Sequence, residues 1–181
     1  SDAMVQSVLA RVCRFRHQHS KADRHADRAL ALNPNDSHVL IQVATAKLFG
    51  GEFEDGCALA CRACELNPLH GDWYLGIVGW NLFMMRRYDE ALGYLEKGGE
   101  TIVNFPAYRA ACAAIAGDLA RAQNEYQLFV REYRNKIAFG REPDPGEALR
   151  WAIQVEPFRR LEDSRHMPDI LRQAGIAEID V

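Results

Sequence analysis

The sequence predicts an all-α fold of stacked helix hairpins, because one pattern of helix stops and starts recurs at a nearly constant spacing. The Asn-Pro pair that ends a helix at Pro34 returns 34 residues later at Pro68. The aromatic residue that opens the second helix of a hairpin, Phe53, is matched 35 residues later by Tyr88. A repeat of this length is typical of solenoids in which each unit is one helix–turn–helix pair.

This spacing divides the chain into four repeats and a tail. Ala44 and Gly79 hold equivalent positions in the second and third repeats, where a small residue lets two helices approach closely. We therefore expect Gly79 and Ala91 to be buried where the helices of the third repeat meet. Residues 1–3 precede Met4 and are interpreted as an expression scar. The repeats are 4–36, 37–70, 71–102 and 103–133, and the tail of a linker and two C-terminal capping helices is 134–181.

Each helix of the repeats is predicted from apolar residues at helical spacing between the stops. The first helix is expected to pack by an apolar stripe that consists of Val5, Val8, Leu9, Val12 and Cys13. In the second repeat, Gly51 suits the turn, since glycine takes a positive φ without a steric penalty. Gly98 stands where the other repeats have larger residues, so we expect the helix that it ends to fray early or to pack loosely. The expected helices are 4–16, 21–32, 37–49, 53–66, 73–86, 88–98, 106–116 and 119–133.

The tail is predicted to add helices over residues 147–155 and 161–174. Asp144 suits the N-cap before the first of them. Pro157 ends that helix, and Pro168 lies inside the second, where we expect a kink or a break because proline removes a backbone donor. Terminal units of a solenoid must cover its open end. We therefore expect the two helices to cap the stack.

The composition is typical of a soluble globular or solenoid protein. The chain has 181 residues, of which 48% are hydrophobic and 26% charged, with a net charge of −3. This charge gives no basic field to attract nucleic acid or an anionic membrane. No apolar run reaches the roughly 20 residues of a membrane span. The five cysteines, an odd number, all fall in expected helices, which favours free thiols in a reducing cytoplasm.

No motif in the sequence predicts catalysis. The chain contains no nucleophile elbow, no glycine-rich phosphate loop and no carboxylate pair with a supporting histidine. We therefore expect a protein that is not an enzyme and that needs no cofactor.

Four segments carry a resemblance to a known family, namely residues 66–75, 86–92, the Glu-Pro-Phe-Arg run at 156–159, and 170–176. With the 34-residue period they resemble tetratricopeptide repeats, and more narrowly the repeats that follow the catalytic domain of some bacterial class III adenylate and guanylate cyclases. The resemblance implies a right-handed superhelix whose concave groove holds a protein or peptide partner. It implies no catalytic residue, because the sequence contains no cyclase domain. The expected role is a scaffold in bacterial signalling or regulation.

In that family the first helix of each hairpin lines the groove. Trp80 is the expected central anchor, because a tryptophan presents a large area with few rotatable bonds. Gln42 and Thr45 are expected to supply hydrogen bonds, and Arg11 and Arg14 favour an apolar or mildly acidic segment. An equally weighted alternative is that these aromatic residues only pack between neighbouring repeats. The expected groove residues are Arg11, Gln42, Thr45, Phe49, Trp73, Ile77, Trp80, Phe83, Met84 and Tyr108.

Two other functions stay open. Cys57, Cys61 and Cys64 lie on one helical stripe, which would suit a metal or redox site. The stripe lacks the Cys-x2-Cys pair of structural zinc sites, and free cysteine usually acts as a small apolar residue, so we favour reduced, metal-free thiols. The other alternative is self-association into a homo-oligomer through the groove or the last helix.

Overall fold

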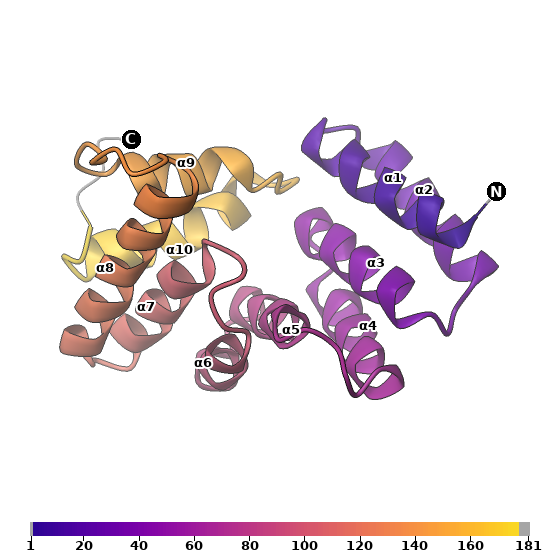
Figure 1. The fold of residues 1–181 in the computed structure, drawn as a ribbon, viewed down its shortest axis with the longest axis horizontal. Coiled ribbons are helices and arrows are strands. Elements are labelled where there is room, and N and C mark those ends of the chain that lie inside the picture. The colour runs from indigo at the N-terminus through magenta and orange to yellow at the C-terminus, as the bar shows by residue number, and fades with distance from the viewer. Residues whose placement is uncertain (1, 178–181) are drawn as a thin grey trace.

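The computed structural model describes residues 2–177, and every regular element in that range is a helix (Figure 1). The all-α expectation is confirmed for these residues, whereas residue 1 of the expected scar and residues 178–181 of the tail lie outside them. None of the described helices combines the length and apolarity that crossing a membrane requires. The helices are α1 (Ala3–Phe15), α2 (His19–Leu32), α3 (Ser37–Gly50), α4 (Phe53–Leu66), α5 (Trp73–Met84), α6 (Tyr88–Lys97), α7 (Phe105–Ile115), α8 (Leu119–Lys136), α9 (Glu147–Val155) and α10 (Leu161–Gln173).

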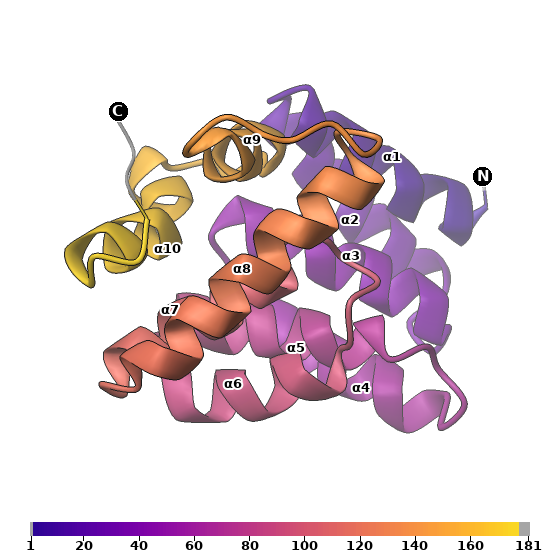
Figure 2. The same ribbon diagram turned by 60° about the vertical axis from the view of Figure 1, so that its left-hand side comes forward.

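Consecutive helices pair into four hairpins, α1/α2, α3/α4, α5/α6 and α7/α8. The first helices of the hairpins also touch in order, α1 with α3, α3 with α5 and α5 with α7. We call these four helices the A-helix layer. The second helix of each hairpin contacts the first helix of the next, so every hairpin is joined to its neighbour through both of its helices (Figures 1 and 2).

Local sequence determines where several of these helices begin and end. The Asp36 carboxylate caps α3 by accepting hydrogen bonds from the backbone N–H groups of His38 and Val39, at 2.9 and 3.1 Å. Gly51 ends the same helix with a φ of 83°, as expected for the turn glycine. Asp2, which belongs to the expected scar, caps α1 in the same way as Asp36 caps α3.

Glycines bring the two helices of the third hairpin into contact. A Cβ atom at Gly79 would lie 2.8 Å from the backbone nitrogen of Leu95 and 3.0 Å from the carbonyl oxygen of Ala91. The expected burial of Gly79 and Ala91 is therefore confirmed. The expectation of loose packing at Gly98 is wrong, because a Cβ there would lie 2.5 Å from the Cα of Gly76. Two facing glycines thus let the backbones touch.

Helix α1 packs by a different face from the one expected. Of the expected stripe, Val5, Val8 and Val12 remain exposed, and only Cys13 is buried. The buried face centres instead on Arg14, whose guanidinium donates to the Ala46 carbonyl at 2.9 Å. A buried guanidinium needs such partners, so the hydrogen bonds of Arg14 orient the helix and turn the valines outward.

The tail begins as a cap but does not stay at the end of the stack. Helix α9 follows α8, with the rings of Trp151 and Tyr133 centred 5.3 Å apart. The α9–α10 loop then reaches toward α3 (Figure 1). There the Phe158 ring lies 5.1 Å from the Phe49 ring, and the Arg159 N–H donates to the Phe49 carbonyl at 2.9 Å.

After this loop, α10 packs against α7. The His166 ring is centred 4.9 Å from Phe83, and its Nε2 hydrogen-bonds with the Tyr88 hydroxyl at 2.8 Å. The tail therefore covers part of the A-helix layer and not only the open end of the stack, because its aromatic residues are buried there. Helix α10 also continues through Pro168 without the break considered for that position, since proline removes only one backbone donor.

Candidate functional site

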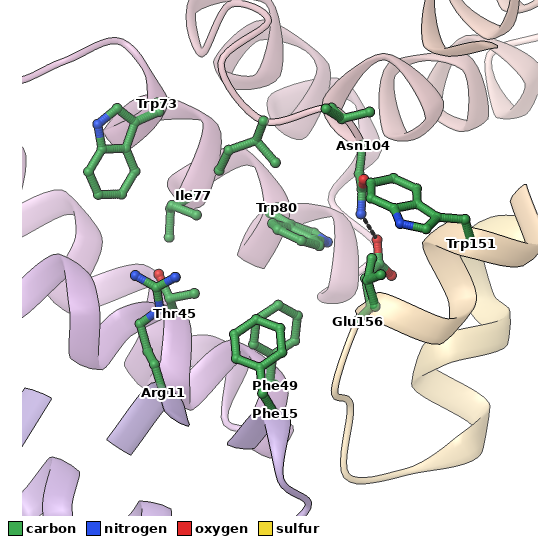
Figure 3. Close-up of a pocket in the computed structure, with 13 residues that line it drawn as sticks. Arg11, Phe15, Thr45, Phe49, Trp73, Ile77, Trp80, Asn104, Trp151 and Glu156 are labelled. Atoms are coloured by element: carbon green, nitrogen blue, oxygen red, sulfur yellow. Dashed lines mark hydrogen bonds between the residues drawn. The ribbon is translucent and has the colours of Figure 1, made fainter. Parts of the chain in front are cut away.

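A cavity of about 290 Å³ lies between the A-helix layer and the returning tail (Figure 3). Its walls come from α1, α3 and α5, from the α6–α7 loop, and from α9 with the residue that ends it. All three tryptophans of the chain border it. The lining residues are Arg11, Phe15, Thr45, Phe49, Trp73, Ile77, Trp80, Ile102, Val103, Asn104, Trp151, Val155 and Glu156.

The structure brings six of the ten expected groove residues together around this cavity. The other four do not line it. Gln42 supports a lining residue, because its Oε1 accepts a hydrogen bond from Arg11. Phe83, Met84 and Tyr108 are buried in the core, where the rings of Phe83 and Tyr108 meet edge to face at 4.8 Å. The six that line the cavity are Arg11, Thr45, Phe49, Trp73, Ile77 and Trp80.

The exposed, anchoring role expected for Trp80 is corrected by the structure. Only 4% of its surface is exposed, because its indole packs among Phe49, Phe105 and Tyr108 at ring-centre distances of 5.4, 5.9 and 5.1 Å. Trp80 is therefore the floor of the cavity. Its indole nitrogen lies near the Tyr108 hydroxyl but makes no hydrogen bond of normal geometry with a described group, which is rare for a buried donor.

Seven lining residues were missed by the sequence-based expectation. Phe15 comes from the end of α1, and the others from the α6–α7 loop and from the tail. The three tail residues, Trp151, Val155 and Glu156, reach the cavity because the tail folds back over the A-helix layer, which no local pattern encodes. The one sequence signal for these residues is Trp151, because it is one of only three tryptophans in the chain and the other two were already expected in the groove. The seven are Phe15, Ile102, Val103, Asn104, Trp151, Val155 and Glu156.

One end of the cavity holds a buried carboxyl group, that of Glu156, which is 5% exposed. The Asn104 side-chain amide donates to Oε1 at 2.6 Å (Figure 3). The Tyr108 hydroxyl donates to Oε2 at 2.7 Å. Burial raises the pKa of Glu156 to about 7, although these two hydrogen bonds favour the ionised form and act in the opposite direction. The three side chains link the tail to the A-helix layer through a group that titrates near neutral pH.

The other end of the cavity holds a cation, the guanidinium of Arg11 (Figure 3). It donates to the neutral Gln42 amide, and its Nε is buried without a partner among the described residues. Burial lowers its pKa, with no neighbouring charge contributing, yet an arginine side chain stays protonated at any physiological pH. The cavity therefore has a positive end whose charge no described carboxylate balances.

The thiol stripe has a different character. Cys57 and Cys61 share a hydrogen bond, which raises the pKa of Cys57 and lowers that of Cys61 to about 7. Burial raises the pKa of Cys64 to about 11. Within residues 2–177, no group of three or more histidine, cysteine or acidic side chains is placed to hold a metal ion. Of the three thiols of the stripe, Cys61 therefore has the lowest pKa.

Comparison with known proteins adds no family to this description. No protein-family model matches the chain, and no curated protein matches it at a significant level. The resemblance to tetratricopeptide repeats therefore stays a prediction that rests on the repeats themselves.

Proposed function

We propose that the chain is a tetratricopeptide-like scaffold that binds an extended segment of a partner protein on its A-helix layer, without catalysis of its own. The right-handed superhelix, the cytoplasmic location and the role in bacterial signalling or regulation belong to the same proposal. The stacking of four hairpins supports it, because each hairpin adds one helix to the same continuous surface.

The observation that carries the proposal is that this surface already holds a segment of the chain itself. Residues 156–160, between α9 and α10, are not helical. Phe158 is 6% exposed and packs on Phe49, while the Arg159 N–H donates to the Phe49 carbonyl. A pocketed side chain combined with main-chain hydrogen bonds is a common mode of recognising an extended peptide.

Polar contacts fix both ends of this segment. At its start, the Glu156 carboxyl accepts hydrogen bonds from Asn104 and Tyr108. At its end, beside the A-helix layer, the Arg160 guanidinium lies 5.7 Å from the centre of the ring of Phe53, the first residue of α4, in a cation–π contact. The surface therefore suits a partner segment that presents an acidic, an aromatic and a basic residue in this order.

A labelled peptide with the sequence of residues 153–161 tests the proposal by fluorescence anisotropy. The full-length Phe158→Ala chain is expected to bind it at least about tenfold more tightly than the wild-type chain, in which the tethered segment competes at a millimolar or higher effective concentration. A matched control is Phe139→Ala, because Phe139 is 91% exposed to solvent and does not belong to the A-helix layer.

The peptide itself supplies the second control. A version with alanine in place of its phenylalanine is expected to bind neither chain, because the phenylalanine ring provides most of the buried area. The proposal is contradicted if the Phe158→Ala chain binds the two peptides equally. It is also contradicted if neither the Phe158→Ala chain nor the wild-type chain binds the unchanged peptide. Far-UV circular dichroism checks that both variants remain folded.

A further inference from the structure

The cavity has the size and lining of a small-molecule site. Its volume of about 290 Å³ exceeds the roughly 150 Å³ of an apolar cavity that already binds benzene. Trp73, Ile77, Trp80 and Phe49 give it broad apolar walls. Ligand pockets combine such walls with a few polar groups that fix orientation.

The polar groups at its two ends are of opposite kinds. At one end, the Arg11 guanidinium contacts only a neutral amide and keeps a buried, unpartnered Nε. A half-buried positive charge of this kind is stabilised by an anion brought to it. At the other end, the Glu156 carboxyl already accepts hydrogen bonds from Asn104 and Tyr108, and in its ionised form it would repel a second anion. The cavity therefore suits a molecule with one negative end and an apolar body.

We propose that this cavity binds a small aromatic monocarboxylate, with its carboxylate on Arg11 and its ring between Trp73, Ile77 and the Trp80 floor. A ring fits because aromatic groups stack favourably on indole and phenyl faces. A carboxylate fits because guanidinium and carboxylate form strong charge-assisted hydrogen bonds. This binding goes beyond the scaffold function, since it needs no protein partner.

The probes are 2-naphthoate and its uncharged isostere 2-naphthamide, titrated into the full chain by calorimetry. The acid is expected to bind at least about tenfold more tightly than the amide, as expected for one charged hydrogen-bonding contact. Location is read by ¹H–¹⁵N NMR, because the chain has three tryptophans and all three border the cavity. Their indole N–H signals are expected to shift with the acid.

Three variants test the role of Arg11. Arg11→Met keeps the apolar stem, and it is expected to lose at least about tenfold in affinity for the acid while its affinity for the amide stays unchanged. Arg11→Lys restores the charge and is expected to recover most of the loss. Arg16→Met is the matched control, because Arg16 is an exposed arginine at the end of the same helix, and it is expected to bind the acid as the wild type does.

Four results overturn the inference. They are equal affinities for the acid and the amide, no binding of the acid up to about 5 mM, indole signals that do not move, and an Arg11→Met chain that binds the acid unchanged. If Arg11→Met does not fold, the acid–amide comparison on the wild-type chain still decides. The peptide experiment on the Phe158→Ala chain is independent of these titrations, so each proposal can fail without the other.

Discussion

Replacing Glu156 by glutamine tests whether a protonated carboxyl holds the tail on the A-helix layer. Glutamine keeps the shape of the side chain and can accept from the Asn104 amide as Glu156 Oε1 does at 2.6 Å. The Tyr108 hydroxyl, which donates to Oε2 at 2.7 Å, can rotate to accept from the new amide. The substitution thus removes the titration and leaves the hydrogen bonds.

The size of the effect follows from the two pKa values. Burial raises the pKa of Glu156 from 4.5 to about 7 in the folded chain. Between these values the unfolded chain has lost the proton and the folded chain keeps it, so the free energy of unfolding falls as the pH rises. At about 1.4 kcal/mol for each tenfold difference in proton affinity, Glu156 costs the wild-type chain about 3 kcal/mol above pH 7.

The assay is urea unfolding, followed by far-UV circular dichroism between pH 5 and pH 8. His166 has the opposite effect on the pH dependence. Burial, and next the charge of Arg86, lower the pKa of His166 from 6.5 to about 4. Its contribution to the free energy of unfolding therefore rises as the pH rises from about 4 to 6.5. Both chains contain His166, so its contribution cancels when the free energy of unfolding of one chain is subtracted from that of the other. Glu156→Gln is expected to gain most of the 3 kcal/mol relative to wild type across this range. Parallel pH profiles for the two chains would refute the reasoning.

Two further predictions concern packing and thiol reactivity. In thermal unfolding, the Gly79→Ala chain is expected to be less stable than the Gly93→Ala chain by about 1–3 kcal/mol. Both variants gain the same helix propensity. Only Gly79→Ala places a Cβ atom within 3.0 Å of the α6 backbone. Equal melting temperatures would contradict the close contact of α5 and α6. Cys61, with a pKa of about 7, is expected to react with iodoacetamide at pH 7.5 much faster than Cys112, whose pKa burial raises to about 12. Peptide mapping by mass spectrometry measures both rates, and similar rates would count against the Cys57–Cys61 hydrogen bond.

The sequence was sufficient for the helices of the hairpins, because their signals are local. Pro34 and Pro68 each stop a helix through the covalent constraint of one residue, and Gly51 makes its turn through its own φ. The contact between the α5 and α6 backbones was also predictable at Gly79. Its counterpart at Gly98 was misjudged, because a glycine that permits close contact and a glycine that weakens a helix look the same without the facing residue, Gly76.

The parts that could not be predicted depend on contacts between distant segments. The valine stripe of α1 resembles a packing face, yet the buried hydrogen bonds of Arg14 turn the opposite face inward. Likewise, Pro157 was recognised as a helix stop, but nothing local to Phe158 indicates that it meets Phe49 across the molecule. Trp151, Val155 and Glu156 enter the candidate site only through that return of the chain. Sequence reasoning therefore found six of the seven lining residues that the A-helix layer contributes, and none from the α6–α7 loop or the tail.

Glu156 belongs to both proposed functions at once, and this joins them physically. It begins the segment that lies on the A-helix layer, and it is also one wall of the cavity whose other wall includes Arg11. A ligand that fills the cavity lies between the first hairpin and the tail, and so it is expected to stabilise the seated form of the tail. A partner segment that displaces the tail removes one wall of the ligand site. Because binding free energies are coupled reciprocally, the two ligands must oppose each other to the same extent, whichever binds first.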